Sequence, residues 1–145
     1  MDEGVRSGGC VCGAVRYTVR GEPLHVGRCH CADCRKRSGS TYTIYGQWPL
    51  EAFEVTGEYA TYDNDSFCPR CGSRLFLLDE DGVELQLGSL DDAPFELRPE
   101  AELWVKRREP WLPAVDSFRN RRGPAHPVLL CSRRSRIRFF ASSIS

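Results

Sequence analysis

Three cysteines and a histidine occupy the six residues CHCADC, from Cys29 to Cys34. Four more cysteines form two further tight pairs elsewhere in the chain, Cys10 with Cys12 and Cys68 with Cys71. An eighth, Cys131, stands alone near the C-terminus and is expected to be a spectator thiol. Cysteine thiolates in tight pairs and triplets are typical ligands of zinc, so the spacing points to metal binding.

The same spacing speaks against disulfide bonds. One residue separates Cys29 from Cys31, and a bridge between such close neighbours is strained. In an extended segment, residues i and i+2 point to the same face, so both sulfurs would aim at one point and His30 would point away. We expect the protein in the cytoplasm, where thiols stay reduced, and this also favours metal binding or catalysis over disulfides.

A closed structural zinc site needs four ligands, and two cysteine pairs from distant segments supply four. Seven clustered cysteines then leave three. The spacing alone does not say which cluster supplies the three remaining cysteines. The simplest division keeps the three cysteines of CHCADC together in one site. Three thiolates with a fourth position open is the arrangement of a reactive zinc. The alternatives are that His30 or a distant residue closes this site, or that no metal fills it.

The pattern of apolar residues predicts a small fold of short strands. Val15, Tyr17 and Val19 alternate with polar residues, which indicates a half-buried strand. The sequence predicts further strands at 41–45, 53–55, 59–62 and 102–105, and a hairpin of 74–78 with 83–87. A helical turn should run from Cys34 to Gly39, and 63–66 should form a turn. The predicted fold class is therefore mainly β with little helix.

The length of 145 residues fits one domain, but charge is distributed unevenly along it. Residues 1–118 hold 13 Lys and Arg against 20 Asp and Glu, a net charge of −7, whereas residues 119–145 hold seven arginines and no acid. We predict a domain over 4–118 and a basic, loosely ordered tail over 119–145, in which 128–130 and 137–140 are apolar enough to dock. The acidic body argues against nucleic-acid binding except through the tail. No apolar run is long enough for a signal peptide or membrane span.

The motifs GGCVCGAVRY, CHCADCRKRSGS, FCPRCGSRLF, GSLDD and EPW, in this order over roughly 8–116, resemble the family of glutathione-dependent formaldehyde-activating enzymes. The domain of this family also occurs in centromere protein V. The resemblance implies a small β-tent fold with two zinc ions per chain. It assigns Cys10, Cys12, Cys68 and Cys71 to a structural zinc, and Cys29, Cys31 and Cys34 to a second, more labile zinc at the reactive site. The chain departs from the family in its short segment between Gly57 and Cys68, and the tail after 122 has no recognised counterpart.

A zinc held by three thiolates would carry a net charge of −1 and act as a weak Lewis acid. It would be suited to holding an incoming thiol as a nucleophilic thiolate. The predicted function is therefore a zinc-dependent carbon–sulfur lyase-type enzyme acting on small thiol–aldehyde adducts such as S-hydroxymethylglutathione. Its partner would be a small-molecule thiol or thiol adduct, glutathione among them.

Two other functions compete with the enzyme. In one, the chain is a zinc-stabilised binding or scaffold module whose basic tail contacts nucleic acid or protein. In the other, the three-cysteine site loads and unloads zinc as a metal or thiol sensor.

Several residues near the motifs have both a functional and a structural interpretation. The basic run Arg35–Arg37 could attract an anionic thiol, but a solvated helical turn is the simpler interpretation. Three aromatic residues, Tyr42, Trp104 and Trp111, could line a pocket. Aromatic residues of small β proteins are more often part of the core, and this is the favoured interpretation. Asp91 and Asp92 could bind substrate or act as a base, but adjacent aspartates are more often turn formers. His25 and His126 read as surface residues.

Overall fold

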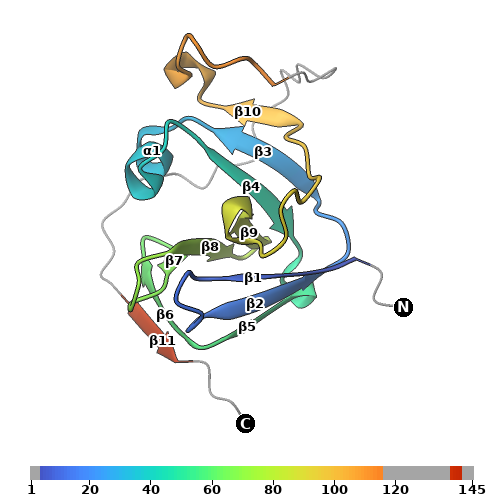
Figure 1. The fold of residues 1–145 in the computed structure, drawn as a ribbon, viewed down its shortest axis with the longest axis vertical. Coiled ribbons are helices and arrows are strands. Elements are labelled where there is room, and N and C mark those ends of the chain that lie inside the picture. Colours follow the sequence, from blue (N-terminus) through green and yellow to red (C-terminus); the bar gives the residue numbers. More distant parts are fainter. Residues whose placement is uncertain (1–3, 116–137, 142–145) are drawn as a thin grey trace.

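Two antiparallel-rich sheets make up the protein in a computed structural model that describes residues 4–115 and 138–141 (Figure 1). The smaller sheet has the order β1-β2-β5, formed by Val5–Gly9, Arg16–Arg20 and Phe53–Thr56. The larger sheet has the order β10-β3-β4-β9-β8-β7-β6-β11. Its strands are, in chain order, β3 (His25–Cys29), β4 (Thr43–Trp48), β6 (Glu58–Tyr62), β7 (Asp65–Phe67), β8 (Arg74–Asp79), β9 (Gly82–Gln86), β10 (Ala101–Leu103) and β11 (Arg138–Ala141). Among the described strand pairs, only β10 with β3 is parallel.

The main core is formed by apolar side chains from both sheets. Tyr17 of β2 contacts Phe53 of β5 and Phe76 of β8, with ring centroids 6.0 Å and 6.4 Å apart. Trp48 at the end of β4 is fully buried, and its indole nitrogen donates to the Gly21 carbonyl oxygen over 2.9 Å. Burial of these large side chains, each contributing roughly 1.5–3 kcal/mol, fixes the two sheets against each other.

One short helix, α1 (Ala32–Ser38), follows β3 and packs at the end of that strand (Figure 1). Three short 3-10 turns complete the described elements: Leu50–Ala52, Leu87–Ser89 and Val105–Arg107. The helix begins after Cys31, whose sulfur accepts a hydrogen bond from the Cys34 amide over 3.3 Å. It ends at Gly39, which adopts a left-handed conformation with φ of 70°. The helix is therefore longer than the predicted turn from Cys34, although its end is as predicted.

The mainly β class is confirmed, and so is the hairpin, which β8 and β9 form. Val15, Tyr17 and Val19 are at most 2% exposed, as their alternation predicts. The strand predicted at 102–105 is wrong in its second half, because Trp104 has a positive φ of 58° that ends the strand. The turn predicted at 63–66 is confined to Asp63 and Asn64, and β7 starts directly after them.

Four strands escape sequence-based detection, namely β1, β3, β7 and β11, and the first two show the reason. β1 has the sequence VRSGG and β3 has the sequence HVGRC, and both lack a run of β-branched or aromatic residues. They form because each pairs with a neighbour over five residues, β1 with β2 and β3 with β4. Tertiary pairing overrides weak local propensity here.

Several predictions concern residues outside the described part of the chain. These are the domain boundary at 118–119, the loose order of most of the tail, and the roles given to His126, Cys131 and 128–130. Of the apolar segment 137–140, the structure describes a strand over Arg138–Ala141 that pairs antiparallel with β6. Within 4–115 and 138–141, no helix has the length and apolarity to cross a membrane.

Candidate metal centres

The first candidate centre joins the two distant cysteine pairs. The sulfurs of Cys10, Cys12, Cys68 and Cys71 all lie within 4.8 Å of one another. The Sγ atoms of Cys10 and Cys12 are 3.5 Å apart, and those of Cys12 and Cys68 are 3.7 Å apart. A tetrahedron with Zn–S bonds of about 2.3 Å has edges of about 3.8 Å, whereas a disulfide is about 2.05 Å long. The four sulfurs therefore fit a closed tetrahedral zinc site and are not bridged.

Two similar backbone loops present these sulfurs. The first lies between β1 and β2, where the Gly13 amide donates to the Cys10 carbonyl over 3.1 Å. The second lies between β7 and β8, where the Gly72 amide donates to the Cys68 carbonyl over 2.8 Å. Both glycines have φ near +80°, which side chains disfavour and which turns the chain sharply after each pair. Each loop thus curls its sulfurs toward a shared point.

The second candidate centre is the cysteine trio of Cys29, Cys31 and Cys34. Their sulfurs lie within 4.8 Å of one another, and each residue is at most 8% exposed. Cys29 ends β3, while Cys31 caps α1 and Cys34 lies in its first turn. The strand-to-helix junction therefore gathers all three sulfurs within six residues. Among the His, Cys, Asp and Glu side chains of the described residues, none joins this group as a fourth member.

His30, between two of these cysteines, is fully buried and held away from the trio. Its Nε2 lies 2.9 Å from Oε1 of Glu102 on β10, and its amide donates to the Leu103 carbonyl over 3.0 Å. Glu102 also accepts from Arg28 Nε at 3.0 Å and from Arg108 Nη1 at 2.7 Å. Burial alone would raise the pKa of Glu102, but the hydrogen bonds from Arg28 and His30 lower it to about 2. This ionised network fixes the peptide between the two cysteines.

The electrostatics of the trio call for a cation. The neighbouring Cys31 and Cys34 thiols, and then burial, raise the pKa of the Cys29 thiol. Three adjacent buried thiolates repel one another, and a divalent cation among them reverses that effect. Soft thiolate donors select zinc among the abundant divalent ions. The donor set of the trio therefore fits zinc, as that of the other four cysteines does.

Replacing Glu102 with alanine should lower the free energy of unfolding by about 3–5 kcal/mol, because the buried Arg28 and His30 lose their acceptor. Glu54→Ala is the matched control. Glu54 forms an exposed ion pair with Arg20 at 3.5 Å, and its loss should change stability by less than about 1 kcal/mol. Urea unfolding of the zinc-loaded variants measures both values. Equal losses in the two variants would show that the network does not hold this region.

The basic run after the trio is largely neutralised. Arg35 pairs with Glu109 at 3.2 Å, and Arg37 pairs with Asp63 at 3.2 Å and Asp65 at 3.4 Å. The structure thus agrees with the interpretation of this run as a helical turn. Ion pairs hold two of its three basic side chains, Arg35 and Arg37.

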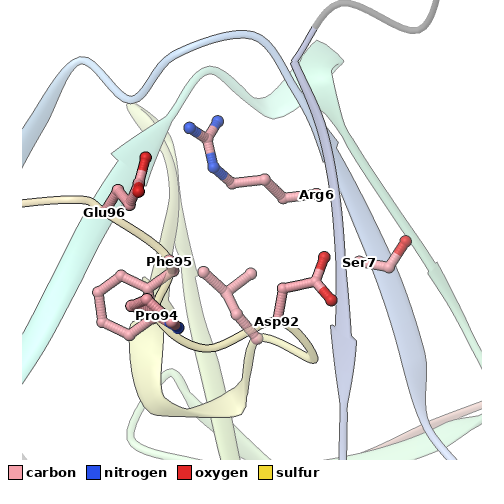
Figure 2. Close-up of a pocket in the computed structure, with 7 residues that line it drawn as sticks. Arg6, Ser7, Asp92, Pro94, Phe95 and Glu96 are labelled. Atoms are coloured by element: carbon pink, nitrogen blue, oxygen red, sulfur yellow. The ribbon is translucent and has the colours of Figure 1, made fainter.

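The adjacent aspartates lie apart from the trio. Asp91 forms an ion pair with Arg16, with Nη1 and Oδ1 2.8 Å apart. Asp92 lines a cavity of about 210 Å³ with Arg6 and Glu96, shown in Figure 2. None of the seven clustered cysteines lines this cavity. The structure therefore brings neither aspartate to a candidate metal centre.

The three aromatic residues considered as pocket or core have different positions. Trp104 is 44% exposed and Trp111 is 68% exposed, so their interpretation as core residues is wrong. Tyr42 lines a larger cavity of about 540 Å³, together with Thr43 and Gln86. None of the seven clustered cysteines lines this cavity either, but Thr43 pairs with Cys29 across β3 and β4, which connects the cavity wall to the trio.

Sequence reasoning missed three residues at the trio: Thr43, Tyr45 and Glu102. Tyr45 is buried in one cluster with the three cysteines. Thr43 is 7% exposed, and its side chain interacts with the Cys34 thiol. Their alternation in β4 marks one face of a strand, but nothing local to β4 indicates that Cys29 and Gly27 lie opposite. Only the pairing register of β3 and β4 shows that Thr43 and Tyr45 lie at the trio.

Comparison with known proteins places this geometry in a family. The family model described as "Glutathione-dependent formaldehyde-activating enzyme" matches residues 5–107. A protein of Halomonas elongata, provisionally named a glutathione-dependent formaldehyde-activating enzyme, is 28% identical over 122 residues. That alignment covers 72% of this chain and 78% of the relative. The matched region contains both candidate metal centres.

Proposed function

The chain belongs to the family of glutathione-dependent formaldehyde-activating enzymes, and on this premise we propose that it is a zinc-dependent carbon–sulfur lyase-type enzyme. Its substrates would be small thiol–aldehyde adducts, such as S-hydroxymethylglutathione, and their components. Cys10, Cys12, Cys68 and Cys71 would hold a structural zinc, and Cys29, Cys31 and Cys34 would hold a second zinc at the reactive site.

The observation that carries this proposal is the incomplete ligand set of the trio. Three buried sulfurs converge, and His30, the nearest further ligand in sequence, is bonded to Glu102 instead. Zinc held by three thiolates would leave one position for a substrate thiol and lower the pKa of that thiol from about 8.5. A closed four-ligand site would offer no such position.

The reaction is the reversible joining of a thiol and an aldehyde. The thiol loses its proton, its sulfur forms a bond to the carbonyl carbon, and the carbonyl π electrons move to oxygen. That oxygen takes up one proton, so a hemithioacetal forms with no net change in protons. The protein's own contribution would be to orient the sulfur and to exclude water, since the trio is at most 8% exposed.

The cavity of about 540 Å³ supports a substrate larger than a bare thiol. It extends from Thr43, opposite Cys29, past Arg37 and Arg74. Two arginines on its wall favour a substrate that carries carboxylates, although both arginines already pair with Asp65. Such a chamber would hold the non-reacting part of an anionic thiol such as glutathione.

Exchange NMR tests the proposed reaction at equilibrium. Formaldehyde labelled with ¹³C and glutathione form the adduct spontaneously, so catalysis appears as faster exchange between the free and adduct signals. The zinc-loaded protein should accelerate exchange in proportion to its concentration, and smaller neutral thiols should exchange less efficiently. Exchange at the spontaneous rate with every thiol of a panel would rule the enzyme out.

A further inference from the structure

The ring of Tyr45 packs against the cysteine trio, and no described residue hydrogen-bonds to its hydroxyl. Cys29, Cys31, Cys34 and Tyr45 form one buried cluster, against which Leu103 packs. Tyr45 itself is 5% exposed. A buried tyrosine hydroxyl usually finds a hydrogen-bond partner. No described residue hydrogen-bonds to the Tyr45 hydroxyl, yet its oxygen is not among the fully buried polar atoms that lack a partner, so this hydroxyl keeps some contact with solvent.

The register of β3 and β4 places Tyr45 on the face that carries the trio. Tyr45 pairs with Gly27, and two residues along the ladder Thr43 pairs with Cys29. Opposite residues of an antiparallel pair project to the same face, as do residues two apart on one strand. Tyr45, Thr43 and Cys29 therefore project from the same side of the sheet.

Gly27 makes room for the ring of Tyr45. A methyl group on Gly27 would lie 2.4 Å from the tyrosine oxygen and 2.5 Å from Cζ, both far inside contact distance. Gly27 has no positive φ, so the backbone does not require glycine there. The rings of His25 and Tyr45 also pack in an edge arrangement, with centroids 5.6 Å apart. The phenol is thus held over a position that only glycine leaves free.

The hydroxyl of Tyr45 is suited to donating a hydrogen bond. A tyrosine phenol carries its proton at neutral pH and can donate it in a hydrogen bond. Because no described residue uses this hydroxyl, it is available to a partner from outside the chain, either water or a substrate.

We propose that the Tyr45 hydroxyl is a catalytic hydrogen-bond donor to the oxygen of the aldehyde, the same oxygen that becomes the hydroxyl of the adduct. This proposal rests on the proposed function. As the carbon–sulfur bond forms, the carbonyl π pair moves to oxygen, and the phenol O–H stabilises the negative charge there. Water then supplies the proton that this oxygen gains, which balances the proton lost by the thiol. In the reverse direction the adduct hydroxyl loses its proton to water, the phenol O–H stabilises the resulting alkoxide, and the carbonyl re-forms as the sulfur leaves with the electron pair of the carbon–sulfur bond.

Tyr45→Phe removes the hydroxyl and leaves the ring. Loss of one such donor typically lowers the rate about 10²–10³-fold, so we expect that loss at saturating substrate, with the KM for thiol unchanged. Zinc content and the unfolding midpoint should stay at wild-type values, because the hydroxyl has no partner in the protein. A variant with wild-type exchange rates would overturn the proposal.

Gly27→Ala is the complementary variant, because it keeps the phenol but displaces it. It should lower the exchange rate in the wild-type background and have little further effect on the rate in the Tyr45→Phe background. Independent losses that multiply in the double variant would mean that Gly27 acts through something other than the hydroxyl. Zinc content of each variant shows whether the trio has kept its metal.

A readout that does not depend on turnover uses protein labelled with ¹³Cζ-tyrosine. The chain has five tyrosines, and the signal missing from Tyr45→Phe belongs to Tyr45. This signal should shift when glutathione and formaldehyde are added together, and much less with glutathione alone. An unchanged signal in protein that accelerates exchange would refute the role of Tyr45 and leave the proposed function intact. Failure of the wild-type protein to accelerate exchange would instead remove the proposed function.

Discussion

Replacing Cys71 with serine is expected to unfold the chain. The four sulfurs of its group come from the β1–β2 loop of the small sheet and the β7–β8 loop of the large sheet, 56 residues apart at Cys12 and Cys68. Zinc bound to them would therefore tie the two sheets together. Structural zinc contributes about 10–16 kcal/mol in small zinc-binding peptides, comparable to the whole stability of a domain. A serine hydroxyl is a poor substitute for a thiolate ligand.

Circular dichroism, the thermal unfolding midpoint and elemental analysis measure this effect. We expect Cys71→Ser to lose its cooperative transition, or to unfold tens of degrees earlier, with loss of zinc. The matched control is Cys34→Ser in the trio, which removes one thiol in the same way but from a group within a single strand-to-helix junction. If Cys71→Ser unfolds at the wild-type midpoint, the four cysteines do not hold a structural metal.

Replacing Cys31 with serine should abolish activity while the fold survives. The Cys31 sulfur has two roles: it belongs to the trio, and it accepts the Cys34 amide hydrogen bond at the start of α1. Serine is among the best residues at a helix N-cap, so the helix start is preserved. Zinc affinity at the trio should fall, because only two thiolates remain there. We therefore expect zinc content to fall from about two ions per chain to about one.

Zinc content, the unfolding midpoint and exchange NMR distinguish the outcomes for this variant. The exchange rate should return to the spontaneous value, with a midpoint within a few degrees of the wild-type one. Cys31→Ala is a useful companion, since it removes both the ligand and the cap and should cost about 1 kcal/mol more in stability. Two retained zinc ions in Cys31→Ser would mean that the trio is not a metal site as proposed.

Cys71→Ser and Cys31→Ser are expected to differ in their effect on stability, because one cysteine group joins distant parts of the chain and the other is local. The trio spans six residues of one strand-to-helix junction, and the Glu102 network supports that junction from β10 without any metal. The other group closes long loops between two sheets. Loss of a local group leaves the rest of the core packed, whereas loss of a long-range tie releases both sheets.

The sequence alone determined the donors and their local grouping. Cysteines separated by one or two residues are close in any fold, so CHCADC brings its three sulfurs together through local geometry. The period of two in Val15, Tyr17 and Val19 likewise fixed a buried strand face, because alternation needs no knowledge of the partner strand. The mainly β class follows from several such short segments.

Only the tertiary structure decided what surrounds the donors. The meeting of Cys10 and Cys12 with Cys68 and Cys71 requires two sheets to pack in one arrangement, and chain spacing does not encode it. The positions of Tyr45 over Gly27 and of Glu102 against His30 depend on strand register and on a parallel pairing between segments more than 70 residues apart. Residue spacing limits the distance between near neighbours along the chain, but contacts between distant segments arise only when the whole core packs. For this reason the candidate ligands were readable in the sequence, whereas the proposed catalytic donor was not.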